Sequence, residues 1–271
     1  MNAVPAEISA LVTGASSGIG EQFARRLAAR GHDLILVARR GQRMRRLAAE
    51  LEESHRVSVS VLVADLSTAT GRDAVVGPLR SRSPWLLINN AGFGTMGRFV
   101  EIDPKRANEM VAVNALAVHE LTLAVLPGNV SAGGGGILNV ASTAALQPLP
   151  YFATYAATKA FVLHLSEALA VEVRGTGTRV MALCPGPVAT EFGDVSGSDR
   201  LGAVAQRSAM SAVRCVDIAL RAFDRGDAVC VPGVLNVGGA IAVRMLPRAV
   251  VRRAVGIGVE VLQRRGRPSS G

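Results

Sequence analysis

The first two-thirds of the chain alternate between short apolar runs, rich in β-branched residues, and longer segments with helical periodicity. Apolar strands separated by helices predict right-handed βαβ units and a parallel sheet that is buried on both faces. We therefore expect an α/β fold, a Rossmann-like doubly wound parallel sheet flanked by helices, with a nucleotide site at its topological switch point. The expected strands are 8–13, 33–38, 57–64, 85–90, 137–142, 178–184 and 228–231, and the longest expected helices are 40–54, 69–81, 104–126 and 152–174.

The composition is that of a folded chain with an apolar core. Of its 271 residues, 49% are hydrophobic and 19% are charged, which argues against disorder. We treat residues 1–271 as a single domain. Within it we expect a substrate lid at 191–212, where the sequence is polar and rich in Gly and Ser, and an apolar and basic C-terminal extension at 234–271.

Cysteine and histidine usage indicates a reducing compartment and no metal. The three cysteines are an odd number without metal-ligand spacing, and the four histidines are scattered. Residues 1–12 lack the charged start and long apolar run of a signal peptide, and no uninterrupted apolar run reaches the length of a spanning helix. We expect a cytoplasmic protein.

The net charge of +9 raises the question of an anionic partner. Nucleic acid is disfavoured, because aromatic residues are only 4% of the chain and none is interleaved with the arginines to stack on bases. A solvated basic surface, or a ligand that carries phosphate, explains the charge better.

The string TGASSGIG at 13–20 follows an expected strand and opens an expected helix. Gly14 permits a tight turn, while Gly18 and Gly20 let the backbone approach a pyrophosphate at the helix N-terminus. An ordinary structural loop is the alternative. The strand-turn-helix context favours cofactor binding.

The end of the second expected strand indicates which dinucleotide is bound. NAD-binding folds usually place an acidic residue there for the ribose 2′-hydroxyl. This chain has Ala38 instead, followed by Arg39, Arg40 and Arg43. A guanidinium binds a 2′-phosphate with charge-assisted geometry, whereas a carboxylate repels it. The sequence therefore favours NADP, with NADPH preferred over NADH, although a solvated basic helix start would look similar.

Tyr155 and Lys159 stand four residues apart in a helical run, so they share one helix face. A phenol is a poor acid or base at neutral pH, and a nearby ammonium would lower its pKa. Ser142 ends the preceding expected strand, where its hydroxyl could polarise a carbonyl. A Tyr-x-x-x-Lys pair alone is usually only a surface pair, but with the other motifs it becomes specific.

The spacing Gly-x-x-x-Gly-x-Gly at 14–20, the string NNAG at 89–92, Ser142 and the Tyr-x-x-x-Lys pair follow one another in the order of the short-chain dehydrogenase/reductase family. The chain resembles the classical type of that family over about residues 8–232. The resemblance implies that Tyr155 is the catalytic acid and base, that Lys159 tunes it and binds the nicotinamide ribose, and that Ser142 orients the carbonyl. It also implies that Asn114 holds a proton-relay water.

The resemblance extends to the rest of the cofactor site. Asp65, in VADLS, matches the family residue that contacts adenine, although it could only cap a helix. Asn90 is expected to be largely structural. In CPGPVATEF, the Val188 N–H and the Thr190 hydroxyl would bind the cofactor. The expected cofactor residues are Gly14, Ser16, Ser17, Gly18, Ile19, Gly20, Arg39, Arg40, Asp65, Leu66, Asn90, Ala91, Gly92, Tyr155, Lys159, Pro185, Gly186, Val188 and Thr190.

These residues together predict an NADP(H)-dependent oxidoreductase that interconverts a carbonyl (ketone or aldehyde) and an alcohol. An epimerase or dehydratase on the same fold, or a non-catalytic NADP(H)-binding regulator, are the alternatives. The regulator would be expected to lack Ser142, Tyr155 or Lys159. The substrate is a small molecule that the sequence does not identify.

Two apolar regions predict contacts with other molecules. Helices 104–126 and 152–174 are apolar over much of their circumference and, in the family, form the main dimer interface, so we expect a homodimer or homotetramer. Pro247 divides the segment 234–263 into two apolar pieces, each too short to span a bilayer. We favour helices that cover the substrate cleft or pack on a sister subunit. Peripheral membrane contact through Arg244, Arg248, Arg252 and Arg253 is the alternative.

Overall fold

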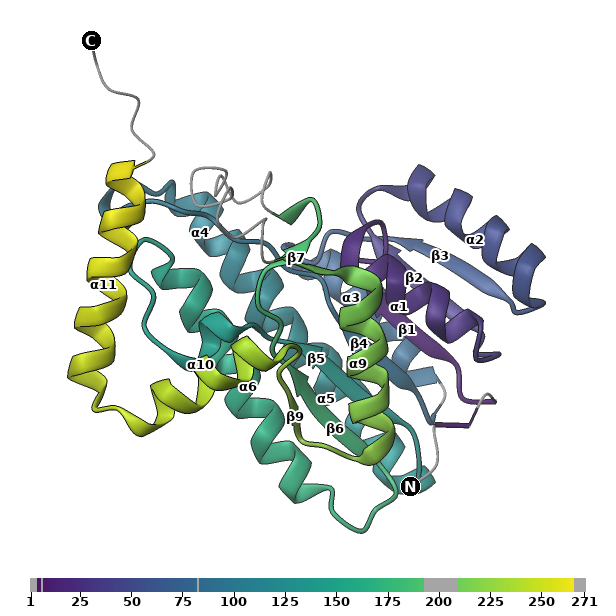
Figure 1. Ribbon diagram of the computed structural model, residues 1–271. Helices are drawn as coiled ribbons and strands as arrows, with labels where there is room; N and C mark the ends of the chain where they lie inside the picture. Colours follow the sequence, from purple (N-terminus) through teal and green to yellow (C-terminus); the bar gives the residue numbers. More distant parts are fainter. Residues whose placement is uncertain (1–3, 6, 82, 193–208, 266–271) are drawn as a thin grey trace.

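The computed structural model describes residues 4–5, 7–81, 83–192 and 209–265, with side chains to residue 258. Among these residues, a seven-stranded parallel sheet has the strand order β3-β2-β1-β4-β5-β6-β9 (Figure 1). Each expected strand is present and slightly shorter than the apolar run that predicted it. The strands are β1 (Ala10–Thr13), β2 (Leu34–Ala38), β3 (Val59–Val63), β4 (Leu86–Asn89), β5 (Gly136–Val140), β6 (Arg179–Leu183) and β9 (Val229–Cys230).

Helices cover both faces of this sheet, which confirms the doubly wound Rossmann-like fold. One face carries α1 (Gly18–Ala28), α2 (Gly41–His55) and α9 (Ala212–Arg225), whose apolar residues share a core with β1 and β2. The other face carries α3 (Ala69–Ser81), α5 (Ala117–Ala132) and α6 (Ala153–Glu172). The strand order reverses between β1 and β4, so the switch point lies at the carboxyl ends of these two strands.

The helix expected at 104–126 is longer and less regular than its sequence suggested. It consists of α4 (Pro104–Val111), a π-helical segment at Ala112–Leu116 and α5, which passes through Pro127 and ends before Gly133 in the left-handed region. By length and composition alone this 29-residue stretch could cross a membrane. It packs on α3 and α6 instead, as a core helix of a sheet face does.

The expected lid at 191–212 lies mostly outside the described residues. Its first residues, Glu191 and Phe192, are described, as are residues 209–212 at its end. There β8 (Met210–Ser211) pairs with β7 (Val188–Ala189) beside the main sheet, and α9 begins.

The C-terminal extension forms α10 (Val234–Met245) and α11 (Arg248–Arg265), which meet at Pro247 and extend away from the sheet on the side opposite α2 (Figure 1). No residue of α10 is buried, and Val251 is the buried residue among the described side chains of α11. Among the described side chains of these two helices, none lines the main cavity. The exposed apolar side chains include Val234, Leu235, Ile241, Met245, Val250 and Ile257.

Candidate active site

A cavity of about 870 Å³ opens at the carboxyl ends of β1, β4 and β5, where a doubly wound sheet binds its ligands. Every residue expected to act in catalysis or cofactor binding lines this cavity, except Gly20 and Asn114. Residues from across the sequence therefore meet at one site, as the sequence predicted. Gly20 and Asn114 do not line the cavity but contact residues that do.

The Gly-rich turn is shaped for a close approach by a ligand. Gly14 has φ +65°, which favours glycine, and a Cβ on Gly20 would collide with the Gly14 carbonyl oxygen and the Asn90 amide. The turn leads into α1 at Gly18, and Gly18 and Ile19 of its first turn, whose N–H groups have no partner within the helix, line the cavity. This arrangement fits the diphosphate of a dinucleotide.

Asn90 holds the turn in place, in agreement with its expected structural role. Its Nδ2 donates to the Thr13 carbonyl oxygen at 2.9 Å and to the Gly14 carbonyl oxygen at 3.3 Å. The Thr13 hydroxyl oxygen in turn accepts from the backbone N–H groups of Asn90 and Ala91. The ends of β1 and β4 are thereby tied together beside the cavity.

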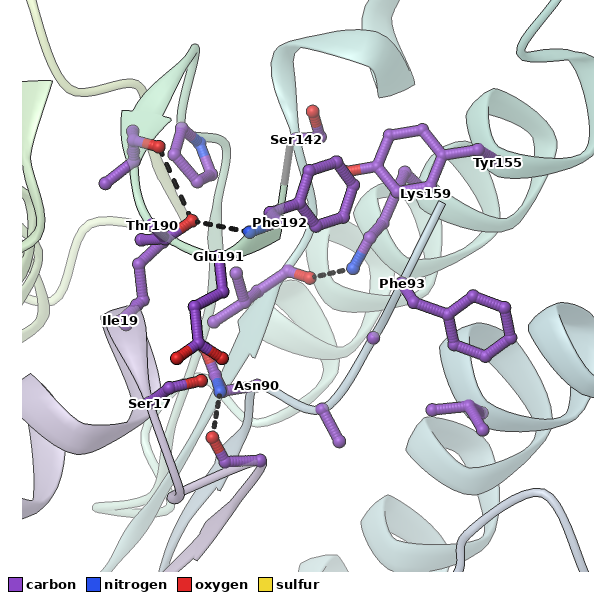
Figure 2. Close-up of a pocket in the computed structure, with 18 of the residues that line it drawn as sticks. Ser17, Ile19, Asn90, Phe93, Ser142, Tyr155, Lys159, Thr190, Glu191 and Phe192 are labelled. Atoms are coloured by element: carbon purple, nitrogen blue, oxygen red, sulfur yellow. Dashed lines mark hydrogen bonds between the residues drawn. The ribbon is translucent and has the colours of Figure 1, made fainter. Parts of the chain in front are cut away.

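The reacting end of the cavity brings together Ser142, Tyr155 and Lys159 (Figure 2). Tyr155 and Lys159 lie on α6. Ser142 lies two residues beyond β5 rather than at its end, because it caps a short 3₁₀ helix at Thr143–Leu146, with its hydroxyl oxygen accepting from the Ala144 N–H at 3.1 Å. The Lys159 Nζ donates to the Val140 carbonyl oxygen at 2.7 Å and lies 5.9 Å from the centroid of the Tyr155 ring.

Burial dominates the acid-base properties of this group. It raises the pKa of Tyr155 to about 12, although a hydrogen bond with the Ser142 side chain acts in the opposite direction. It lowers the pKa of Lys159 to about 8. The expected lowering of the pKa of Tyr155 is therefore absent in the free chain, since desolvation of the phenol outweighs the hydrogen bond. A protonated Tyr155 is suited to donate a proton.

Asn114 is fully buried in the π-helical segment, and its amide is fully engaged. Its Oδ1 accepts from the Phe93 N–H at 3.0 Å, while its Nδ2 donates to the Phe93 carbonyl oxygen at 2.9 Å and to the Thr158 hydroxyl at 3.2 Å. A Cβ on Gly92 would meet Asn114 and the Lys159 Nζ at 3.1 and 3.3 Å. The Asn114 side chain thus positions the loop after β4 beside Lys159.

The far end of the cavity holds the basic residues that follow β2. The Arg39 Nη1 lies 3.9 Å from the Asp65 carboxylate. The Oδ1 of Asp65 accepts from the Ser67 N–H in the turn before α3, while the Thr68 hydroxyl oxygen accepts from the Gly71 N–H at 3.0 Å and caps that helix. Asp65 is therefore not the helix cap of the alternative. The Arg40 Nε and Nη2 donate to the hydroxyl oxygens of Ser16 and Ser17 at 3.1 and 2.6 Å. A guanidinium is therefore fixed against the Gly-rich turn.

Several lining residues carried no signal in the sequence. Apolar side chains that line the cavity include Phe93, Val113, Leu149, Phe152 and Phe192. The ring centroids of Phe152 and Phe192 lie 6.0 and 5.4 Å from that of Tyr155. The Phe192 ring packs on Tyr155, and Glu191 pairs with Arg40, which precedes α2, and with Arg43 in the first turn of α2. An isolated aromatic or acidic residue in an irregular segment has no periodicity or motif to reveal which elements it will meet.

The doubly wound sheet and the Gly-rich turn beside the cavity define an α/β protein of the dinucleotide-binding class. Residues 9–201 match the family model for short chain dehydrogenase, and the chain belongs to that family. This finding confirms the family that the motifs at 14–20, 89–92 and 155–159 indicated.

Curated relatives match about two-thirds of the chain. A very-long-chain 3-oxoacyl-CoA reductase from Anas platyrhynchos is 33% identical over 192 residues, covering 69% of this chain and 62% of its own. The match thus spans about three-fifths of that relative's length. An inactive hydroxysteroid dehydrogenase-like protein 1 from Homo sapiens is 31% identical over 188 residues, covering 68% of this chain and 56% of its own.

Solved structures match nearly the whole chain. A short-chain dehydrogenase from Sphingobium yanoikuyae in complex with NADPH has a TM-score of 0.79 and 34% identity, covering 97% of this chain and 98% of its own. A bulky-bulky ketone specific alcohol dehydrogenase from Comamonas testosteroni has a TM-score of 0.76 and 34% identity, covering 89% of this chain and 93% of its own.

Proposed function

We propose that this chain catalyses the NADPH-dependent reduction of a bulky, largely apolar ketone or aldehyde to its alcohol, and the reverse oxidation. The observation that carries the proposal is one continuous cavity. It joins the Gly-rich turn and Arg40 at one end to Ser142, Tyr155 and Lys159 at the other, with aromatic side chains around Tyr155.

In this proposal the bound nicotinamide supplies the hydride that reduces the carbonyl carbon. Tyr155 gives its phenolic proton to the carbonyl oxygen, and the high pKa of Tyr155 keeps that proton available. Ser142 donates a hydrogen bond to the same oxygen and holds it toward Tyr155. Lys159 binds the nicotinamide ribose, while Asn114 keeps the loop at Gly92 and Phe93 against the site.

NADPH preference is supported by charge at the far end of the cavity. Ala38 leaves no carboxylate at the end of β2, while Arg39 and Arg40 line the cavity there. A 2′-phosphate would gain charge-assisted hydrogen bonds from these guanidiniums, whereas a 2′-hydroxyl would gain little. The similar structure from Sphingobium yanoikuyae is a complex with NADPH.

A bulky apolar substrate is supported by the apolar lining of the cavity. Phe93, Phe152 and Phe192 contribute aromatic surface, and Val113 and Leu149 add aliphatic surface. Burying such surface favours a ligand with apolar groups on both sides of its carbonyl. The relatives named for very-long-chain 3-oxoacyl-CoA and bulky ketones are consistent with this class.

Steady-state kinetics with the purified chain test the proposal. Ketones of graded size, from acetone to diaryl and long-chain ketones, would be measured with NADPH and with NADH. We expect kcat/KM to rise with apolar bulk and to be higher with NADPH. Turnover of small ketones only would overturn the proposed substrate class. Equal kcat/KM with both cofactors would overturn the proposed preference for NADPH.

The same assay separates the enzyme from the alternative, a non-catalytic regulator. One human relative of this chain is named as inactive, so the alternative is tested directly. The regulator would bind NADPH without oxidising it in the presence of any carbonyl. Binding without turnover across the panel would therefore favour the regulator.

A further inference from the structure

Glu191 places a carboxylate against the arginines that follow β2. Its Oε2 lies 2.6 Å from the Arg40 Nη1, and its Oε1 lies 2.6 Å from the Arg43 Nη1. Figure 2 shows this carboxylate beside Ser17, on the same side of the cavity as the Gly-rich turn. The two arginines come from the start of α2, and Glu191 follows β7, 151 residues beyond Arg40.

The surroundings of this carboxylate are those of an anion-binding site. The Arg40 guanidinium is held by the hydroxyl oxygens of Ser16 and Ser17, so it is oriented before any ligand arrives. Arg43 supplies a second charge from the first turn of α2, which follows Arg40. A phosphate oxygen is bound by the same kinds of donor that bind the carboxylate oxygens here.

Protonation does not release the carboxylate at any pH that an enzyme ordinarily meets. Hydrogen bonds from Arg40 and Arg43 lower the pKa of Glu191 to about 2. The pair is also partly exposed, with 42% of the Glu191 side chain accessible, so each ion pair is only moderately strong. A competing anion of higher charge can therefore take the arginines.

We propose that Glu191 is an internal competitor for the 2′-phosphate of NADP(H): its carboxylate occupies Arg40 and Arg43 in the free chain and yields them when the cofactor binds. The inference rests on the proposed use of NADPH and adds a residue that sets its affinity. Because Phe192 follows Glu191 and packs on Tyr155, the exchange links the adenosine end of the cavity to the reacting end.

The test measures two ligands that differ only in the 2′-phosphate. Adenosine 2′,5′-bisphosphate and adenosine 5′-monophosphate would be titrated by calorimetry into the full chain, Glu191→Gln and Glu50→Gln. Glu50 is a matched control, since it also pairs with an arginine, Arg25, at 2.6 Å and lines the neighbouring groove. Removing it changes the net charge equally.

We expect Glu191→Gln to bind the bisphosphate about three- to tenfold more tightly, the range that two exposed ion pairs would give. Its affinity for the monophosphate should stay unchanged, and Glu50→Gln should match the parent chain for both. An unchanged or weaker affinity of Glu191→Gln for the bisphosphate would overturn the proposal. An equal gain for both ligands would also overturn it, because the competition would then not involve the 2′-phosphate.

These outcomes are distinguishable from failure of the proposed function. A parent chain that binds both ligands equally contradicts NADPH preference. A parent chain that prefers the bisphosphate, with no gain in Glu191→Gln, leaves NADPH preference intact and contradicts only the role of Glu191.

Discussion

The ring of Phe192 lies on the ring of Tyr155, with 5.4 Å between their centroids and 51° between their planes. Phe192 also lines the cavity, so it lies beside the proposed proton donor. We expect Phe192→Ala to raise KM for a bulky ketone about three- to tenfold, because part of an aromatic contact is lost, and to change kcat much less. Initial-rate kinetics at saturating NADPH measure both constants.

Phe99→Ala is the matched control for this prediction. Phe99 is 70% exposed and does not line the cavity. Its removal should leave KM unchanged. A Phe192→Ala variant with the KM of the parent chain would show that Phe192 does not contact the substrate.

The low pKa of Lys159 gives a pH dependence with a defined sign. Since the pKa of this ammonium is about 8 in the free chain, its cofactor-binding form is present below that pH and is lost above it. We expect kcat/KM for NADPH, which reports the free enzyme, to fall as the pH rises through about 8. Tyr155, with a pKa of about 12, keeps its proton through this range. A value that stays constant to pH 10 would contradict the assignment.

The same group also affects stability. Between pH values of about 8, the pKa of Lys159 in the folded chain, and 10.5, the ordinary pKa of lysine, Lys159 holds fewer protons in the folded chain than in the unfolded chain. Its contribution to the free energy of unfolding should therefore rise with pH in that window. Thermal unfolding of Lys159→Met compared with the parent chain checks the sign.

Asn114 is expected to act mainly through position and stability. Asn114→Ala would leave the buried N–H and carbonyl groups of Phe93 without partners, so we expect a loss of about 2–4 kcal/mol of unfolding free energy. Asn108→Ala, an exposed position on the same helix, should change it by less than about 0.5 kcal/mol. Urea denaturation compares the two, and equal effects would contradict the account.

Much of this architecture could be predicted from sequence because its signals are local. Apolar runs such as 34–38 mark buried strands by composition, and Tyr155 and Lys159 share a helix face through their spacing alone. The Gly-rich turn is recognisable by the spacing of its glycines. This spacing is required because a Cβ on Gly20 would collide with the carbonyl oxygen of Gly14 in the same turn. These signals do not depend on the rest of the chain.

The remaining features depend on contacts between distant segments. The pairing of Glu191 with Arg40 joins residues 151 apart, and no periodicity connects them. The sign of the pKa shift of Tyr155 follows from desolvation of the phenol by the residues around it, which a Tyr-x-x-x-Lys pattern does not contain. The π-helical segment at Asn114 likewise satisfies a polar side chain through Phe93 and Thr158.

Self-association remains a prediction, and the exposed apolar residues of two helices indicate where it would occur. Leu123 on α5 is 59% exposed and Phe161 on α6 is 43% exposed. We expect light scattering to give a dimer or tetramer, and Phe161→Arg to weaken it at least about tenfold, since a charge would be buried at the interface. Phe99→Arg should leave the assembly unchanged. A strict monomer at micromolar concentration would contradict the prediction.

The exposed apolar surface of α10 and α11 is a second candidate surface for self-association. If a sister subunit covers these helices, a chain ending at Gly233 should lose assembly or aggregate. The full chain should then remain at the bottom of a flotation gradient with anionic vesicles at low salt. Flotation of the full chain would favour peripheral membrane contact instead.

The central claim is that Tyr155 donates the proton that completes carbonyl reduction. The most direct measurement is the turnover of Tyr155→Phe with NADPH and a bulky ketone, alongside its NADPH affinity by fluorescence titration. The substitution removes only the hydroxyl, so we expect kcat to fall at least about a hundredfold while the NADPH affinity stays within about twofold of the parent chain. Near-normal turnover in Tyr155→Phe would contradict the mechanism.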